Sequence, residues 1–172
     1  MKPDYDLAVM QHRQTLTGTL VRMLTGLDEL LEQEKPDLVM VHGDTNTTAA
    51  GSLAAFYRHI PLAHVEAGLR TFDKYSPYPE EINRRIAGIT ADIHFAPTPR
   101  AKENLLKEQV KEETIFVAGQ TGVDATLDTL ARPHVFEEPR LRELDFESHR
   151  VIAVTAHRRE NWGEPMRQMF TA

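Results

Sequence analysis

The chain has 172 residues, of which 41% are hydrophobic and 27% are charged. These proportions are typical of a folded globular protein and argue against global disorder. The formal net charge is −6. A surface for nucleic acid or an anionic membrane needs clustered Lys and Arg, so neither partner is expected. Cysteine is absent, which excludes disulfides, thiolate metal ligands and a cysteine nucleophile.

The chain shows no membrane-spanning or targeting segment. No run reaches the ~18 consecutive apolar residues that a transmembrane helix needs. Residues 1–6 lack the apolar stretch of a signal peptide. Together with the missing cysteine, these features predict a cytoplasmic protein.

Helical and strand-like patterns follow one another along the chain. Leucines from Leu16 to Leu31 recur at helical spacing and predict an amphipathic helix over 11–34. The next elements, in chain order, are a strand at 37–41, a helix at 47–58, a strand at 62–65, a helix at 80–86, a strand at 92–96, a helix from 99, a strand at 115–119 and a helix at 123–130.

This alternation is typical of βαβ units. Strands that are joined by helices pair in parallel and are covered by helices on both faces of the sheet. The sequence therefore predicts an α/β fold with a Rossmann-like parallel sheet.

The composition changes after residue 131. Residues 132–149 contain two prolines and many charges with little periodicity, so we interpret them as an interdomain linker. The apolar run at 151–155 predicts a strand that opens another domain. We therefore expect an incomplete N-terminal Rossmann-like domain over 1–131 and the start of a truncated C-terminal one over 150–172.

Polar side chains follow the predicted strands. Ligands of open parallel sheets bind beyond the carboxyl ends of the strands. Those ends carry Asp44, Glu66, Gln120 and His157. The arrangement predicts a cleft lined by carboxylates, with a cationic group contributed from beyond the linker.

Each acidic residue also has a structural interpretation. Asp44 could cap the helix near Thr47, because Asp is a favoured capping residue. Glu66 directly follows a buried strand, where a carboxylate costs stability unless it is paired, so a functional and an ion-paired role are both open. Glu80 could complement a helix N-terminus. We interpret Glu81 as a solvated helix residue and His64 as a hydrogen-bonded core histidine.

Several cationic residues have two interpretations as well. The turn at 157–160 is either a salt-bridged loop or an anion site that holds a diphosphate through charge-assisted hydrogen bonds. Three arginines either bring positive charge near the carboxylates or form ordinary surface pairs. They are Arg70, Arg84 and Arg85.

Metal and cofactor motifs are incomplete. The run 42–44 is similar to the Gly-Asp turns of metallophosphoesterases, and 64–66 matches half of a zinc deaminase signature whose cysteine ligands are absent. His94 and His157 do not complete a convincing ligand set. Neither a Walker loop nor a Gly-x-Gly-x-x-Gly motif is present, so no metal and no cofactor is expected.

Four motifs in a fixed order resemble one family. They are Val-His-Gly-Asp-Thr at 41–45, His-Val-Glu-Ala-Gly-Leu-Arg at 64–70, Ser-Pro-Tyr-Pro-Glu-Glu-Ile-Asn-Arg at 76–84 and Thr-Ala-His-Arg-Arg-Glu-Asn at 155–161. This set resembles the bacterial non-hydrolysing UDP-N-acetylglucosamine 2-epimerases. Members of that family are longer, so the resemblance implies a central fragment of a two-domain, glycosyltransferase-B-type architecture.

The resemblance also implies site residues and partners. Asp44, Glu66, Glu80 and His157 match the family's catalytic positions, and Asp44, Glu66, His157 and Arg158 match substrate-binding ones. Arg70 lies on the segment near the family's regulatory site. The implied substrate is UDP-N-acetylglucosamine, and the implied full-length assembly is a homodimer without metal or cofactor. The chain departs from the family at Gln120, where asparagine is usual.

The implied reaction inverts the configuration at C2 of the sugar. UDP is eliminated to give 2-acetamidoglucal, and UDP then adds back to this intermediate. A carboxylate base needs desolvation to raise its pKa, which a strand-end pocket provides. Two alternatives stay open. The fragment could be inactive by itself, or the protein could be a hydrolysing relative that releases UDP and N-acetylmannosamine.

Overall fold

The computed structural model describes residues 2–156 and 161–171. The chain divides into two compact units, Met1–Leu127 and Asp128–Ala172.

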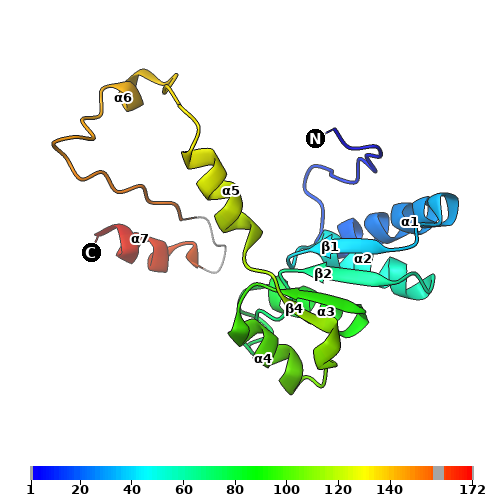
Figure 1. Ribbon diagram of the computed structural model, residues 1–172. Coiled ribbons are helices and arrows are strands. Elements are labelled where there is room, and N and C mark those ends of the chain that lie inside the picture. The colour runs from blue at the N-terminus through cyan, green and yellow to red at the C-terminus, as the bar shows by residue number, and fades with distance from the viewer. Residues whose placement is uncertain (1, 157–160, 172) are drawn as a thin grey trace. The chain divides into compact units, whose positions relative to one another are not determined.

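The first unit is built on a parallel sheet, as predicted. Its four strands are hydrogen-bonded in the order β1-β2-β3-β4. They are β1 (Val39–His42), β2 (Leu62–Val65), β3 (Ile93–Ala96) and β4 (Ile115–Val117) (Figure 1). The helices are α1 (Leu16–Glu34), α2 (Asn46–Tyr57), α3 (Glu80–Thr90), α4 (Pro99–Lys107), the short 3₁₀ helix η1 (Glu112–Thr114) and α5 (Thr121–Leu130), which continues past the boundary at Leu127. The α/β fold class is confirmed.

The helices cover one face of the sheet. On that face a Cβ at Gly51 of α2 would lie 2.9 Å from Val41. The His94 ring shares this face and hydrogen-bonds through Nε2 to the Gly88 carbonyl of α3 at 3.1 Å. The opposite face carries Met40 and Phe116, which are 59% and 51% exposed. The expectation of helices on both faces is therefore wrong for the described residues.

Threonines begin three of the helices. The hydroxyls of Thr15, Thr45 and Thr98 accept hydrogen bonds from backbone N–H groups of α1, α2 and α4. The cap at Thr15 explains why α1 begins at Leu16 rather than at residue 11. The predicted capping role of Asp44 is wrong, because its neighbour Thr45 caps α2.

A glycine lets the turn after β2 pass close to α4. Gly68 has φ +87°, and a Cβ there would lie 2.2 Å from the Ala101 carbonyl oxygen. Asn104, on the same helix, donates a 3.0 Å hydrogen bond to the Gly68 carbonyl. This contact fixes the backbone that follows Glu66.

The second unit contains the helices α6 (Pro139–Arg142) and α7 (Glu164–Thr171). Residues 151–156 have no regular secondary structure, so the strand predicted at 151–155 is wrong. A strand needs a hydrogen-bonding neighbour, and the described part of this unit contains no other strand. Across residues 2–156 and 161–171, no helix is long and apolar enough to span a membrane.

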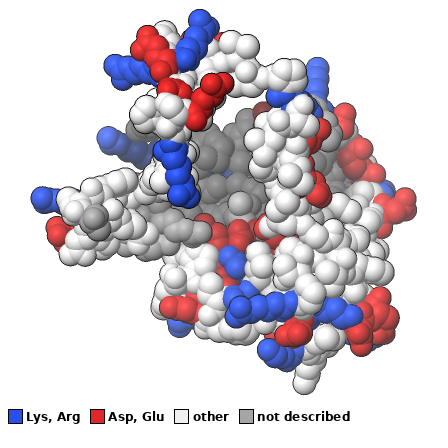
Figure 2. All heavy atoms as spheres, turned by 60° about the vertical axis from the view of Figure 1, so that its left-hand side comes forward, with Lys and Arg blue, Asp and Glu red and all other residues white. Residues whose placement is uncertain are grey.

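Charges of both signs are distributed over the surface. On the face drawn in Figure 2, Lys and Arg are interspersed with Asp and Glu rather than gathered into one basic patch. This distribution agrees with the net charge of −6.

Candidate active site

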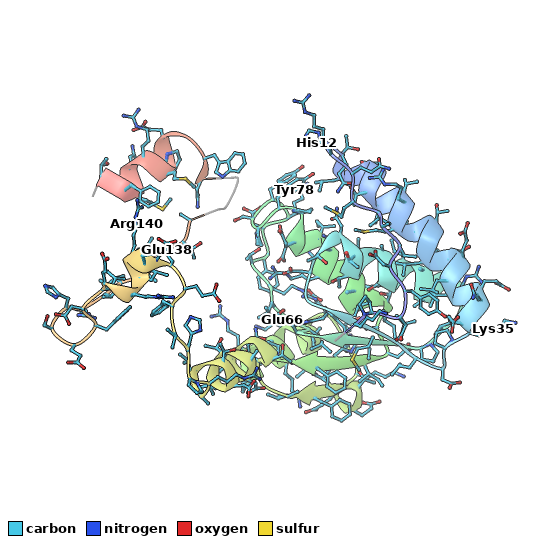
Figure 3. The ribbon with its side chains drawn as sticks, turned by 90° about the horizontal axis from the view of Figure 1, so that it is seen from above. His12, Lys35, Glu66, Tyr78, Glu138 and Arg140 are labelled. Carbon is cyan, nitrogen blue, oxygen red and sulfur yellow. The ribbon has the colours of Figure 1, made fainter. Side chains whose placement is uncertain are left out.

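Glu66 lies where the ends of three strands meet. It directly follows β2, and its Oε1 accepts a 2.6 Å hydrogen bond from Nε2 of Gln120, which follows β4. Its Oε2 is 3.5 Å from Nε2 of His42, the last residue of β1. Figure 3 shows Glu66 at the edge of the sheet where α5 begins. Parallel strands therefore bring together side chains that are 54 residues apart along the chain.

The backbone of Glu66 is strained. Its φ of 68° lies in the left-handed region, which costs a residue with a Cβ about 1–2 kcal/mol. Such strain clusters at functional sites, where the surrounding structure enforces it. Here the Gly68 turn follows directly, and a Cβ at Gly43 would lie only 3.4 Å from Glu66 Oε2.

Asp44 is close to two other carboxylates and one arginine. Its Oδ2 is 2.6 Å from Nη2 of Arg84, and the two side chains are 28% and 10% exposed. Burial raises the pKa of Asp44, the negative charges of Glu80 and Glu66 raise it further, and Arg84 opposes the rise. The structure therefore brings the predicted residues Asp44, Glu66 and Glu80 into one electrostatic cluster.

The two glutamates that begin α3 differ in their surroundings. Glu80 has a buried Oε2 with no hydrogen-bond partner among the described residues. Glu81 is fully buried, and its carboxylate accepts hydrogen bonds from the N–H groups of Thr71 and Phe72, both at 3.1 Å. The prediction of a solvated Glu81 is wrong, because the loop before α3 folds back over this side chain.

His64 is a core histidine, as predicted. It is fully buried, and its Nε2 hydrogen-bonds to the Gly43 carbonyl at 2.8 Å. Burial lowers its pKa to about 4, so the ring is neutral at pH 7. Its role is to hold the turn that presents Asp44.

Arg70 forms a buried ion pair. Its Nε and Nη2 donate to the two oxygens of Glu108 at 2.8 and 2.7 Å, and its side chain is fully buried. The pair lowers the pKa of Glu108. The guanidinium is thus occupied by Glu108, and the regulatory role of Arg70 stays a prediction.

The predicted site residues His157 and Arg158 lie outside the described residues. Their roles in catalysis and substrate binding stay predictions.

A pocket of about 680 Å³ opens beside Glu66. Its polar side is formed by His42, Glu66 and Gln120, and the first turns of α5 form an apolar side with Val123 and Leu127. Such a pocket suits a ligand that has both polar and apolar parts. His42 belongs to the Val-His-Gly-Asp-Thr motif and to the incomplete metal motif, but neither pattern predicts its place beside Glu66.

Comparisons with known proteins show which family the chain resembles. Residues 1–172 match the family model described as UDP-N-acetylglucosamine 2-epimerase. A Bacillus subtilis protein of that name is 55% identical over 172 residues, which are 100% of this chain and 44% of the relative. The S. aureus MnaA–UDP structure has 45% identity and a TM-score of 0.86, over 99% of this chain and 44% of that one.

A third relative is the Neisseria meningitidis UDP-GlcNAc 2-epimerase bound to UDP-GlcNAc. It has 48% identity and a TM-score of 0.71, over 76% of this chain and 36% of that one. This chain thus spans less than half the length of the relatives it matches. The ordered motifs, the parallel sheet and these similarities lead to one conclusion: the chain belongs to the UDP-N-acetylglucosamine 2-epimerase family.

Proposed function

We propose that the protein to which this chain belongs is an isomerase that interconverts UDP-N-acetylglucosamine and UDP-N-acetylmannosamine. The observation that carries the proposal is the position of Asp44 and Glu66 after the neighbouring strands β1 and β2, with Glu80 at the start of α3 close enough to act on Asp44. A family member with 48% identity has been solved with UDP-GlcNAc bound, which supports the same substrate here.

The reaction needs groups that exchange protons on two faces of the sugar. A base removes the C2 proton while the C1–oxygen bond breaks, which leaves a C1–C2 double bond and free UDP. Addition of UDP at C1 and of a proton at C2 from the other face gives the epimer. Because C2 is not next to a carbonyl, departure of UDP provides the stabilisation that a simple carbanion would lack.

The carboxylates supply the proton transfers in this proposal. A half-buried Asp44 with a raised pKa is a stronger base than a solvated aspartate, because desolvation disfavours the charged form. Glu66 and Glu80 are the partners for the other face. His157 and Arg158 would stabilise the negative charge of the departing diphosphate.

We also infer a two-domain architecture for the whole protein. Residues 1–131 would belong to the first domain, 132–149 to a linker and 150–172 to the second, with the substrate between the domains. The division of the chain near residue 127 supports a boundary in this region. A cytoplasmic location and a homodimer belong to the same proposal.

Solvent deuterium tests the reaction. The full-length protein, incubated with UDP-N-acetylglucosamine in deuterated water, should place deuterium at C2 of the product. Retention of protium would overturn the elimination route. Free UDP in stoichiometric amounts would instead indicate the hydrolysing relative. The isolated 172-residue chain should be inactive, because catalysis needs the substrate positioned by both walls of the cleft.

Substitution of the carboxylates tests their roles. Asp44→Asn and Glu66→Gln in the full-length protein should each slow epimerisation by about 10²- to 10⁴-fold, the contribution typical of general acid–base groups. Glu103→Gln is the control. It removes the same negative charge from an exposed glutamate on α4, which is not part of the cluster. Wild-type rates for Asp44→Asn would contradict its assignment.

A further inference from the structure

We propose that Arg84 is a positioning residue that orients Asp44 and keeps it charged as a base, and that Glu81 holds Arg84 in place for this task. The inference rests on the proposed epimerisation and concerns two residues that need not touch the sugar.

The anchor of this arrangement is Glu81. Its side chain is fully buried, and the N–H groups of Thr71 and Phe72 both donate to it. Its Oε2 lies 3.8 Å from Nη1 of Arg84, one helical turn further along α3. Residues three apart on a helix lie on the same side, so the pair is built into α3 itself.

Arg84 connects this anchor to the turn that follows β1. Its Nη2 lies 2.6 Å from Oδ2 of Asp44, so the two ends of one planar guanidinium face two carboxylates. A planar, forked cation fixes orientation as well as charge, which the compact ammonium of lysine does not. Arg84 thereby fixes the Asp44 carboxylate relative to the buried Glu81. Glu81 is in turn held by the two hydrogen bonds from the backbone of the loop before α3.

The charges around Asp44 explain why it needs this partner. The groups that act on it are Glu80 and Arg84 from α3 and Glu66 from the end of β2. Burial and the two glutamates favour the neutral form of Asp44. Of these three charged neighbours, Arg84 is the one that favours the charged form. Glu80 differs from Asp44 in this respect, because its buried Oε2 has no hydrogen-bond partner among the described residues.

A titration that needs no turnover tests the proposal. The carboxyl carbon of Asp44 is followed by NMR in the full-length protein labelled with ¹³C-aspartate. Arg84→Gln should raise the pKa of Asp44 by about 1 unit or more, the size of an arginine's effect on a neighbouring aspartate. Arg85→Gln is the matched control, because this neighbouring arginine is exposed and should leave the titration unchanged.

An unchanged titration of Asp44 in folded Arg84→Gln would overturn the proposal. If that variant does not fold, Arg84→Lys in the full-length protein replaces it, with kcat expected to fall more than 10-fold at nearly constant KM. Wild-type kcat in Arg84→Lys would also overturn the proposal. Failure of the unmodified protein to exchange deuterium would overturn only the epimerase assignment, because the titration does not depend on it.

Discussion

His64 and Glu81 are both ionisable and both fully buried, and each is paired with backbone groups. The His64 partner is 21 residues away in the sequence, and the two Glu81 partners are 10 and 9 residues away. Both hold backbone next to the carboxylate cluster: His64 the turn before Asp44, and Glu81 the loop before α3. The acidic site is therefore supported by buried polar groups rather than by apolar packing alone.

The buried imidazole of His64 should make the fold sensitive to acid. Its pKa is about 4 in the folded chain against an ordinary value of 6.5, so the unfolded chain takes up the proton first as the pH falls. Stability is therefore complete above about pH 6.5 and decreases towards pH 4, by about 3 kcal/mol for this group.

Urea unfolding at pH 7 and pH 4.5 measures this effect. In His64→Gln the difference in unfolding free energy between the two pH values should shrink. The exposed His12, labelled in Figure 3, provides His12→Gln as the control. An undiminished difference in His64→Gln would show that other groups cause the acid sensitivity.

At the scale of elements, the turn between β2 and α3 is fixed by its contact with α4. Gly68 accepts a hydrogen bond from Asn104 of that helix, and Arg70 pairs with Glu108 just after the helix ends. The main chain beyond Glu66 is therefore attached at Gly68 and at Arg70 to the C-terminal half of α4 and its cap residue. This attachment positions the backbone next to Glu66 at the carboxyl edge of the sheet.

Gly68→Ala should disrupt this attachment. The new Cβ would meet the Ala101 carbonyl at 2.2 Å, and the φ of +87° is unfavourable for alanine. Overpacking and backbone strain together should cost about 3 kcal/mol. Gly119→Ala is the control: its φ is +83° but nothing lies within 4 Å, so strain alone should cost about 1 kcal/mol. Equal losses in thermal or urea unfolding would contradict the steric argument.

At the scale of the whole molecule, one face of the sheet has no helix of the first unit packed on it, among the residues that the structure describes. Register places Met40, Phe95 and Phe116 on this face, and the rings of Phe95 and Phe116 are 5.9 Å apart. Exposed apolar patches of this kind mark contact surfaces or cause association.

The isolated 172-residue chain should therefore self-associate. Light scattering should show a concentration-dependent mass for the parent chain and a smaller mass for the Met40→Lys/Phe116→Lys variant. Val21→Lys/Ile89→Lys is the control, because these residues are 56% and 81% exposed on α1 and α3 and the variant gains the same two charges away from this face. A clean monomer of the parent at all concentrations would contradict the prediction.

The sequence by itself determined the order of helices and strands in the first unit and the strand ends that carry Asp44 and Glu66. Hydrophobic periodicity and strand-end position are local properties, so they can be read without knowing what packs against them. The ordered motifs likewise determined the family.

Only the tertiary structure decided which groups are paired and which are buried. The contact between Asp44 and Arg84 joins residues 40 positions apart. Glu81 is buried by the loop that contains Thr71, and the hydrophobic pattern of the sequence does not predict the path of that loop. The apolar run at 151–155 lacks a strand partner in the described chain, so its local preference alone did not make it a strand. Pairing and burial depend on neighbours that the fold brings together, and a local pattern does not contain them.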